Sequence, residues 1–476
     1  MKGQFVPLPP SFTEILPAWV AQQRWYAGKG RVPILRRTGG LRLVDPAGEV
    51  DIDVHLLLDE SGQTSTTYQV PLTYRGARLS GADHALIATV EHGSLGTRYV
   101  YDATHDPVFA AAMLRLMLDE AKVASDGAPG LTDALGHRVA GADPGQLLTS
   151  RVLTGEQSNT SIIMDMVDAR GARSNALICK LFRVLHHGEN PDVVVQSALA
   201  AAGSERVPHS VGNVSGQWPD ANAPDGVARG HLAFVQEFLP GVEDAWRVAL
   251  AAVASGVDFS QQAHALGQAT AEVHATLAQT MSTRDATDED TATLVRSMRA
   301  RHATAVSEVP ALAAHDSMIR MSIESVSSAT WPALQRIHGD YHLGQVLDVP
   351  GRGWVLLDFE GEPLRPLAER TKPDLALRDV AGMLRSFDYA AGSWEQTHPG
   401  RSAAPWATRA RTAFLDGYAQ RAGRDPREDA VLLNALELDK ALYEVVYEAR
   451  NRPTWLGIPT TAIARLSAGR RSDPQL

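Results

Sequence analysis

Alternation of apolar and polar side chains predicts strands near the start of the chain. Residues 52–58 and 68–74 each place an apolar residue at every second position, which is typical of a strand with one buried face. Residues 60–63, Glu-Ser-Gly-Gln, predict a turn between them. A helix is expected before these strands, over residues 12–22. The pattern therefore predicts a small antiparallel sheet with one helix packed on it.

A second group of strands is expected further along. Asp106 and Pro107 predict the N-cap and first position of a helix that continues to about residue 121. A linker rich in Gly, Asp, Ala and Pro follows over residues 125–145. The next apolar runs predict strand, polar loop, strand, turn and strand, with the strands over residues 146–153, 160–167 and 175–181.

From about residue 259 the periodicity becomes helical. The expected helices cover residues 261–279, 303–328, 406–421 and 428–451, and a dense polar and apolar stretch over residues 336–362 interrupts them. The pattern predicts an α+β fold in three parts. These are an N-terminal cap subdomain over residues 1–105, a sheet-containing lobe over residues 106–239 and a helical C-terminal lobe over residues 240–476.

Composition and net charge indicate which class of partner to expect. The 476 residues include 45 Lys and Arg against 55 Asp and Glu, for a formal net charge of -10. This sign disfavours non-specific binding to nucleic acid or to anionic lipid, so we expect a small-molecule partner and neither nucleic acid nor membrane. The single cysteine, Cys179, fits a reducing compartment, and no signal peptide or apolar run of eighteen residues is apparent. We therefore expect a cytoplasmic protein.

The most informative stretch runs from residue 337 to residue 362. Asp340 follows a glycine on an expected loop, the amide of Gln345 comes five residues later, and a hydrophobic strand then ends at Asp358. This is the order of base, metal ligand and metal ligand used by protein kinases. Phosphoryl transfer needs a carboxylate to orient the acceptor hydroxyl and hard oxygen ligands for Mg²⁺. The spacing assigns the first role to Asp340 and the second to Gln345 and Asp358.

Two other interpretations apply to the same stretch. Asp340 and Asp358 could each cap a turn, which is the commonest role of an isolated aspartate. His338 and His342, four residues apart, could bind zinc together with Asp358. Gly339 between the histidines, and the absence of a glutamate beside the first one, argue against a zinc-binding helix.

A loop and a lysine in the strand group are candidates for phosphate binding. Residues 154–161 carry backbone amides and small hydroxyls between two apolar strands, although a polar hairpin turn has the same appearance. Lys180 lies in the apolar run of residues 176–182, where burying a lysine is costly unless it meets an anion. The alternative is a lysine that extends from the sheet edge into solvent. The order of loop, strands and lysine matches the nucleotide-binding layout of a kinase N-lobe.

The last long helix carries polar and aromatic residues at intervals of three and four. They share one face, and they are Glu437, Lys440, Tyr443, Glu444, Tyr447 and Glu448. Such a face suits sugar binding. Periodicity alone favours a solvated face, on which Lys440 and Glu444 form an i, i+4 ion pair.

The chain resembles the maltokinase family, within the aminoglycoside-phosphotransferase-like, eukaryotic-kinase-like superfamily. The motifs that carry this resemblance lie at residues 23–28, 155–161, 190–192, 338–347, 358–363, 366–370, 377–389, 437–441 and 451–453. The resemblance implies a bilobal kinase-like fold with an N-terminal antiparallel-sheet cap, an ATP-dependent transfer to maltose and Mg²⁺ as cofactor. It also implies a cytoplasmic monomer or homodimer that feeds α-glucan or glycogen synthesis.

The resemblance also assigns site residues. Asp340 would orient the anomeric hydroxyl of the sugar, and Gln345 and Asp358 would hold the metal. The ATP-contacting set would be Ser158, Asn159, Thr160, Ser161 and Lys180, with Gln236, Glu237 and Phe238 on the strand that faces adenine. The sugar-contacting set would be His342, Glu360, Lys440, Tyr443 and Glu444.

Two departures from the family pattern leave alternatives open. Val194 stands where family members often carry the glutamate that pairs with the strand lysine, and the cap segment of residues 68–101 matches less closely. A glucosamine or other aminosugar kinase of the same fold is the nearest alternative function. A non-catalytic pseudokinase acting as a binding protein is a further one, although the retained Asp340, Gln345 and Asp358 argue against it.

Overall fold

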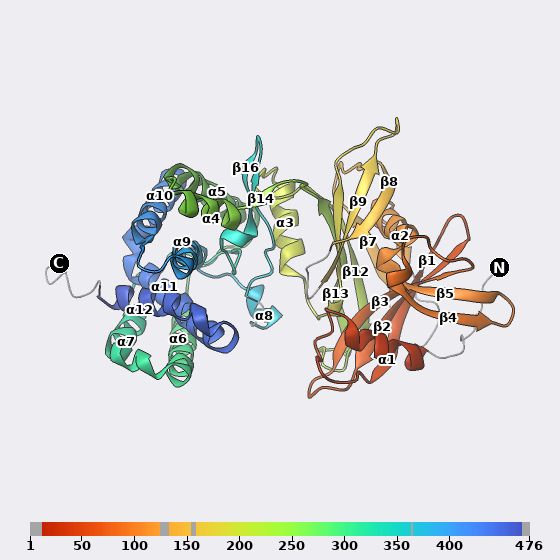
Figure 1. Cartoon of the computed structure of the whole chain (residues 1–476), viewed down its shortest axis with the longest axis horizontal. Helices are drawn as coiled ribbons and strands as arrows, with labels where there is room; N and C mark the ends of the chain where they lie inside the picture. Colours follow the sequence, from red (N-terminus) through yellow and green to blue (C-terminus); the bar gives the residue numbers. More distant parts are fainter. Residues whose placement is uncertain (1–11, 124–132, 154–158, 363–364, 469–476) are drawn as a thin grey trace. The chain divides into compact units, whose positions relative to one another are not determined.

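A computed structural model describes residues 12–123, 133–153, 159–362 and 365–468 of the chain. Contacts between Cα atoms divide the chain into two compact units. Unit 1 comprises Met1–Val193 and His209–Pro240, and unit 2 comprises Val194–Pro208 and Gly241–Leu476. Figure 1 shows that arrows dominate the red-to-yellow part of the chain and that coiled ribbons dominate the green-to-blue part. The α+β prediction, with antiparallel sheets first and helices after, is confirmed. The division into three parts stays a prediction.

The first sheet of unit 1 is preceded by α1 (Phe12–Gln22), as the sequence predicted. Every strand pair in this sheet is antiparallel. Its order is β1-β2-β3-β5-β4, with β11 also paired to β3. The alternation that predicted β2 and β3 corresponds to apolar side chains on a buried face, among them Ile52, Leu56 and Val70. The strands are β1 (Leu35–Leu43), β2 (Val50–Asp59), β3 (Thr66–Arg75), β4 (Leu86–His92), β5 (Gly96–Asp102) and β11 (Val184–Leu185).

The second sheet of unit 1 contains the expected strand group. Its order is β6-β7-β12-β13-β10-β9-β8, and α2 (Pro107–Leu118) adds Phe109 and Met113 to a core shared with Ile162 and Phe234. The Asp106 carboxylate accepts a hydrogen bond from the Val108 N–H, as its predicted role as N-cap requires. The strands are β6 (Lys122–Val123), β7 (Ala134–Arg138), β8 (Gln146–Val152), β9 (Asn159–Val167), β10 (Leu177–Phe182), β12 (Ser210–Pro219) and β13 (Val227–Glu237).

Unit 2 is built around long helices, and α3 begins in unit 1 and continues into it. Helices α5 and α10 approach so closely that a Cβ at Gly267 would collide with the Phe414 carbonyl oxygen, and one at Gly417 with that of His264. A small sheet of order β14-β15-β16 adjoins them. The elements are α3 (Pro191–Ala201), α4 (Ala245–Ser255), α5 (Ser260–Thr280), α6 (Asp288–Glu308), α7 (Asp316–Ser325), α8 (Leu367–Arg370), α9 (Leu377–Thr397), α10 (Ala404–Ala422), α11 (Ala430–Asn451), α12 (Gly457–Ala468), β14 (Glu243–Asp244), β15 (Val346–Val349) and β16 (Gly353–Leu356).

Two predicted segments were wrong in detail. The single helix expected over residues 303–328 is interrupted, because Pro310 opens a 3₁₀ turn (Pro310–His315) between α6 and α7. The linker expected over residues 125–145 contains β7, which pairs with β12. Among the residues that the structure describes, no helix is both long and apolar enough to cross a membrane.

Candidate active site

The loop that carries Asp340 is fixed to α9 through one buried carboxylate. Asp379 accepts hydrogen bonds from the backbone N–H of His338 at 2.8 Å and of Gly339 at 2.9 Å. A third bond, of 3.0 Å, joins it to His274 Nε2 on α5. Burial raises the pKa of Asp379, but the hydrogen bond and charge of His274 and the bond from Gly339 N–H outweigh this and leave it below its usual value. Asp379 thus holds the two residues that precede Asp340.

Two further hydrogen bonds help to hold the same loop on the helices of unit 2. His274 Nδ1 lies 2.9 Å from the Tyr418 hydroxyl of α10, and the Tyr341 hydroxyl lies 2.8 Å from Thr270 Oγ1. Tyr341 follows Asp340 directly and is only 2% exposed. Both sides of Asp340 in the chain are therefore anchored to the helical core of unit 2.

Asp340 lies beside Lys440, which also contacts Glu362. Lys440 Nζ of α11 donates to Asp340 Oδ1 at 3.0 Å and to Glu362 Oε1 at 3.1 Å. Burial lowers the pKa of Lys440, but Asp340 and Glu362 outweigh it and hold the pKa above its usual range. Burial raises the pKa of Glu362, while Lys440, Arg365 and neighbouring arginines bring it down to about 2. Within the described residues, Oδ1 is the carboxylate oxygen of Asp340 that has a partner, so Oδ2 can accept a further hydrogen bond.

The face of α11 that carries Lys440 is not a solvated one. Glu437, Glu444 and Glu448 are all buried. Glu444 accepts from Arg385 at 2.7 Å, and Glu437 pairs with Arg411 and with Arg465. The stripe therefore packs against arginines of α9, α10 and α12. The interpretation as an exposed ion-paired face, which periodicity alone favoured, is wrong.

Tyr443 stands apart from those buried glutamates. Its half-buried ring lies 4.9 Å from Lys440 Nζ and 5.6 Å from the Arg301 guanidinium, measured to the ring centroid. Tyr443 is thus close to Asp340 through Lys440. Glu444, assigned to the sugar by resemblance, bonds Arg385 and lies within the helical core, and its role in sugar binding stays a prediction.

Gln345 and Asp358 lie together, as a shared metal site requires. Gln345 Nε2 donates to Asp358 Oδ2 at 3.0 Å, so the amide and the carboxylate are in direct contact. Asp358 has φ = 65°, a left-handed conformation that is uncommon for a residue other than glycine and concentrates at functional sites. An amide oxygen and a carboxylate are hard oxygen ligands, which fit Mg²⁺. The arrangement is compatible with the predicted role.

The histidines of the loop are not a zinc site. His338 Nε2 donates to the Leu357 carbonyl at 2.8 Å, and its Nδ1 accepts from the Asp340 N–H at 3.4 Å. Both ring nitrogens are therefore engaged. His342 Nδ1 accepts from the Gly344 N–H at 3.1 Å, and burial lowers the pKa of the ring. Glu360 is half-buried beside the Asp358 loop, and its carbonyl accepts from Arg370.

In unit 1, Lys180 has a carboxylate partner despite Val194. Lys180 Nζ lies 2.7 Å from Asp192 Oδ2, and the Asp192 side chain is completely buried. Ser161 of β9 and Phe234 of β13 are directly opposite Lys180 in the register of the sheet. The ion pair that the family pattern assigns to position 194 is therefore supplied two residues earlier.

The remaining candidate residues for ATP have varied surroundings. Thr160 Oγ1 accepts from Arg183 at 2.8 Å, Glu237 Oε2 accepts from the His209 N–H, and the Phe238 N–H donates to the Ala176 carbonyl. Gln236 is buried in β13, and Asn159 begins β9. Ser158 lies outside the described residues.

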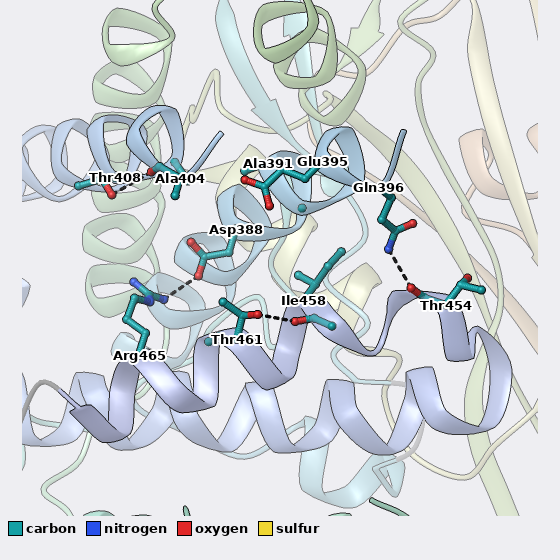
Figure 2. A pocket seen from close by; sticks show the side chains of 14 residues that line it. Asp388, Ala391, Glu395, Gln396, Ala404, Thr408, Thr454, Ile458, Thr461 and Arg465 are labelled. Carbon is teal, nitrogen blue, oxygen red and sulfur yellow. Dashed lines mark hydrogen bonds and ion pairs between the residues drawn. The ribbon is translucent and has the colours of Figure 1, made fainter. Parts of the chain in front are cut away.

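A separate cavity of unit 2 lies between α9, α10 and α12 (Figure 2). Its volume is about 430 Å³. Its polar side chains are already paired, since Arg465 bonds Asp388, Gln396 donates to the Thr454 carbonyl and Thr461 donates to Gly457. Because none of the predicted site residues lines this cavity, we do not assign it to the acceptor.

Sequence reasoning did not assign roles to Asp192, Glu362 or Asp379. All three lie in motifs that carried the family resemblance, at residues 190–192, 358–363 and 377–389. For Asp192 and Asp379 the signal that could have found them is a carboxylate next to apolar residues, because a buried charge requires a partner; Glu362 stands in a polar stretch that gives no such signal.

Comparison with known proteins identifies related chains. Residues 19–106 match the maltokinase N-terminal cap domain. A glucosamine kinase of Mycolicibacterium smegmatis is 31% identical over 336 residues, which cover 66% of this chain and 79% of the relative. A glucosamine kinase of Streptacidiphilus jiangxiensis is 30% identical over 367 residues, which cover 72% and 81% of the two chains.

Solved structures show the same fold. A glucosamine kinase in complex with glucosamine, ADP and inorganic phosphate matches 96% of this chain and 99% of its own, with a TM-score of 0.66 and 24% identity. A second crystal form of glucosamine kinase gives a TM-score of 0.65 at 22% identity. The chain therefore belongs to the family of sugar kinases that includes these glucosamine kinases, which are ATP-dependent phosphotransferases acting on an alcohol group.

Proposed function

We propose that this kinase transfers the γ-phosphoryl group of ATP to maltose, giving maltose 1-phosphate and ADP. We propose further that it does so in the cytoplasm, as a monomer or homodimer, and supplies α-glucan or glycogen synthesis. The observation that carries the choice of sugar is the position of Lys440. Its ammonium group lies 3.0 Å from Asp340 and 3.1 Å from Glu362, the two carboxylates nearest to the acceptor hydroxyl in this proposal.

Cations compensate the carboxylates nearest to Lys440, while Asp358 is paired with the neutral amide of Gln345. Arg365 lies 3.2 Å from Glu362, and Arg301 lies 3.2 Å from Asp439. A protonated amino group on the acceptor would meet Lys440 and these arginines in a poorly hydrated site, where repulsion between like charges is strong. A neutral sugar escapes that repulsion and can hydrogen-bond to the charged groups. The charge pattern therefore favours a neutral acceptor.

In this proposal, the residues of the chain have separate roles in the reaction. Asp340 Oδ2 accepts the hydrogen of the acceptor hydroxyl and orients its oxygen, while Lys440 holds Oδ1 and so fixes the carboxylate plane. Gln345 and Asp358 would hold Mg²⁺, which neutralises phosphate charge when bound. Lys180, kept in place by Asp192, would contact phosphate.

Glucosamine is the second candidate acceptor. This candidate is supported by the two relatives described above, which are both named glucosamine kinase. The two hypotheses differ in charge, because the amino group of glucosamine takes up a proton near neutral pH and maltose has no ionisable group. An acceptor comparison can therefore separate them.

We expect maltose to be phosphorylated with a kcat/KM at least tenfold above that of glucosamine and of glucose. The second glucose ring gives maltose hydrogen bonds that glucose lacks, and Lys440 opposes the amine of glucosamine. ADP release with maltose, glucose, glucosamine, maltotriose and no sugar measures this directly. Glucosamine turned over faster than maltose would reject the maltose proposal and leave the kinase mechanism intact.

Tyr443→Ala is expected to raise the KM for maltose by about tenfold or more, with a smaller change in the KM for ATP. The ring beside Lys440 offers an apolar face and a hydroxyl to the sugar. Tyr447→Ala is the matched control, because Tyr447 lies one turn further along α11 and is 43% exposed. An effect on ATP alone would show that Tyr443 has been placed in the wrong subsite.

Asp358→Asn is expected to weaken Mg²⁺-dependent nucleotide binding as well as turnover. The substitution removes the charged member of the pair while leaving an oxygen in place. Titration of Mg²⁺ at fixed ATP should require about tenfold more metal for half-maximal activity. An unchanged Mg²⁺ requirement in a folded variant contradicts the assignment.

A further inference from the structure

A cavity of about 770 Å³ opens on the second sheet of unit 1, over β7, β12 and β13 (the strands are labelled in Figure 1). None of the predicted site residues lines it. Three histidines do so, together with Asn213, Gln217 and Glu189, and the histidines are His137, His187 and His231. The cavity thus combines groups that donate or accept hydrogen bonds with apolar surface, to which Ala134 and Leu135 contribute.

The hydrogen-bonding roles of two histidines follow from their partners. His231 Nδ1 accepts from the Asn190 N–H at 3.1 Å, and His187 Nδ1 accepts from the Arg229 N–H at 3.3 Å. In a neutral ring the proton then lies on Nε2, so each histidine offers one further donor. Burial and the neighbouring His137 lower the pKa of His231 to about 4, which keeps this ring neutral in the physiological range.

One hydrogen-bond acceptor in the same cavity has no donor among the described residues. The Asn213 side-chain oxygen is buried and has no hydrogen-bond partner among the described residues. A buried polar atom in that state costs free energy unless a ligand or water supplies a donor. The site therefore offers donors from the histidines, an unused acceptor at Asn213 and both kinds of group at Gln217.

Three of the charged residues of the lining are paired, and the exposed Glu189 adds one further carboxylate. Lys122 pairs with Asp133 at 2.7 Å, and Arg229 pairs with Asp225 at 2.9 Å. Within the described part of the chain, no three His, Cys, Asp or Glu side chains of this cavity are close enough to share a metal ion. This balance favours neither an anion nor a metal ion. It suits a neutral ligand with several hydroxyl groups.

The cavity is connected to the lysine of the nucleotide site by a short chain of contacts. His231 holds the backbone of Asn190, and the Asn190 side chain accepts from the Asp192 N–H at 2.9 Å and the Val193 N–H at 3.4 Å. Asp192 in turn holds Lys180 at 2.7 Å. A ligand that fixes the His231 ring would therefore bias the position of the Asp192–Lys180 pair.

We propose that this cavity binds a neutral, polyhydroxylated small molecule of the sugar class, and that its occupancy changes the affinity for ATP through His231, Asn190 and Asp192. The binding claim is independent of the reaction. The coupling claim rests on the proposed role of Lys180 in ATP binding.

Calorimetry on the full chain without nucleotide tests the binding claim, with maltose, glucose, glucosamine and inorganic phosphate as separate probes. We expect a neutral sugar to bind, and Gln217→Ala to weaken that binding about tenfold. Gln146→Ala, on exposed β8 of the same sheet, is the matched control and should change nothing. His137→Ala provides a second lining variant in case Gln217→Ala does not fold.

Sugar binding that neither lining variant changes would overturn the proposal, and so would binding of phosphate but of no neutral sugar. For the coupling, the ATP affinity is measured with and without saturating sugar, and a change of several-fold is expected. Asn190→Ala should keep sugar binding in the cavity and abolish this change. An unaltered ATP affinity in the wild type would overturn the coupling.

Different experimental outcomes would contradict the proposed acceptor and the proposed cavity site. If maltose is not phosphorylated but Gln217→Ala still weakens sugar binding, the proposed acceptor is wrong and the cavity site stands. If maltose is phosphorylated and only Tyr443→Ala weakens sugar binding, the acceptor stands and the cavity site is wrong.

Discussion

Asp340→Asn is expected to lower the turnover of sugar phosphorylation by about three orders of magnitude and to leave ATP affinity nearly unchanged. Loss of a positioned base typically costs 10² to 10⁴-fold. The amide retains the size of the carboxylate but cannot accept the hydroxyl proton. Lys440 keeps its second partner, Glu362, at 3.1 Å, so the charge at the site does not become unpaired. The measurements are ADP release at saturating sugar and equilibrium binding of ATP.

Asp348→Asn is the matched control for this substitution. Asp348 is an exposed residue of β15 in the same unit, so removing its charge should leave turnover and ATP affinity unchanged. Turnover of the Asp340 variant within tenfold of wild type would sink the assignment of the base. A parallel loss of ATP affinity would show instead that Asp340 acts on the nucleotide.

Strands β2 and β3 of unit 1 were predictable because apolar residues alternate with polar ones along them, although both faces of these strands are largely buried. The alternation in residues 52–58 and 68–74 corresponds closely to β2 and β3, where apolar side chains point to a core. Helix α9 was missed for the opposite reason. Its apolar face, which includes Val380, Met383 and Phe387, is interrupted by charged residues that are also buried, among them Asp379 and Arg385.

In the candidate site, too, the sequence could predict only the features that are local along the chain. Asp340, Gln345 and Asp358 could be assigned because their spacing along one loop and strand is local. Asp192 and Glu362 pair with Lys180 and Lys440, which are 12 and 78 residues away in sequence. Pairing over such separations depends on tertiary structure, which no periodicity encodes.

On the face of α11 that carries Lys440, periodicity identified which residues lie together but not whether they are exposed or buried. Glu437 and Glu444 do share a face of α11 with Lys440. The arginines that bury this face, Arg385 and Arg411, come from α9 and α10. Since i, i+4 spacing is compatible with both a solvated and a buried face, the sequence pattern could not choose between them.

Asp379 is the residue for which the structure predicts the largest effect without contact to substrate. Asp379→Ala removes the acceptor for the backbone N–H groups of His338 and Gly339. Each buried donor left without a partner costs about 1–3 kcal/mol, so we expect a loss of several kcal/mol in the free energy of unfolding. Because Asp340 follows these two residues, kcat should also fall about 100-fold, as expected for a displacement of about 1 Å.

Asp379→Asn separates positioning of the loop from overall stability. The amide oxygen can accept one backbone N–H, so this variant should recover part of the stability lost in Asp379→Ala while kcat stays low.

The carboxylate has a lowered pKa in the fold, so its stabilisation is present above the unfolded pKa and is lost as pH falls through the folded value. The Asn variant should therefore lose less stability than wild type as the pH falls below the ordinary pKa of an aspartate. Thermal unfolding across this range and kcat at neutral pH are the measurements. If kcat rises in proportion to stability across the two variants, Asp379 is a structural residue only; if kcat stays low while stability recovers, it positions the base.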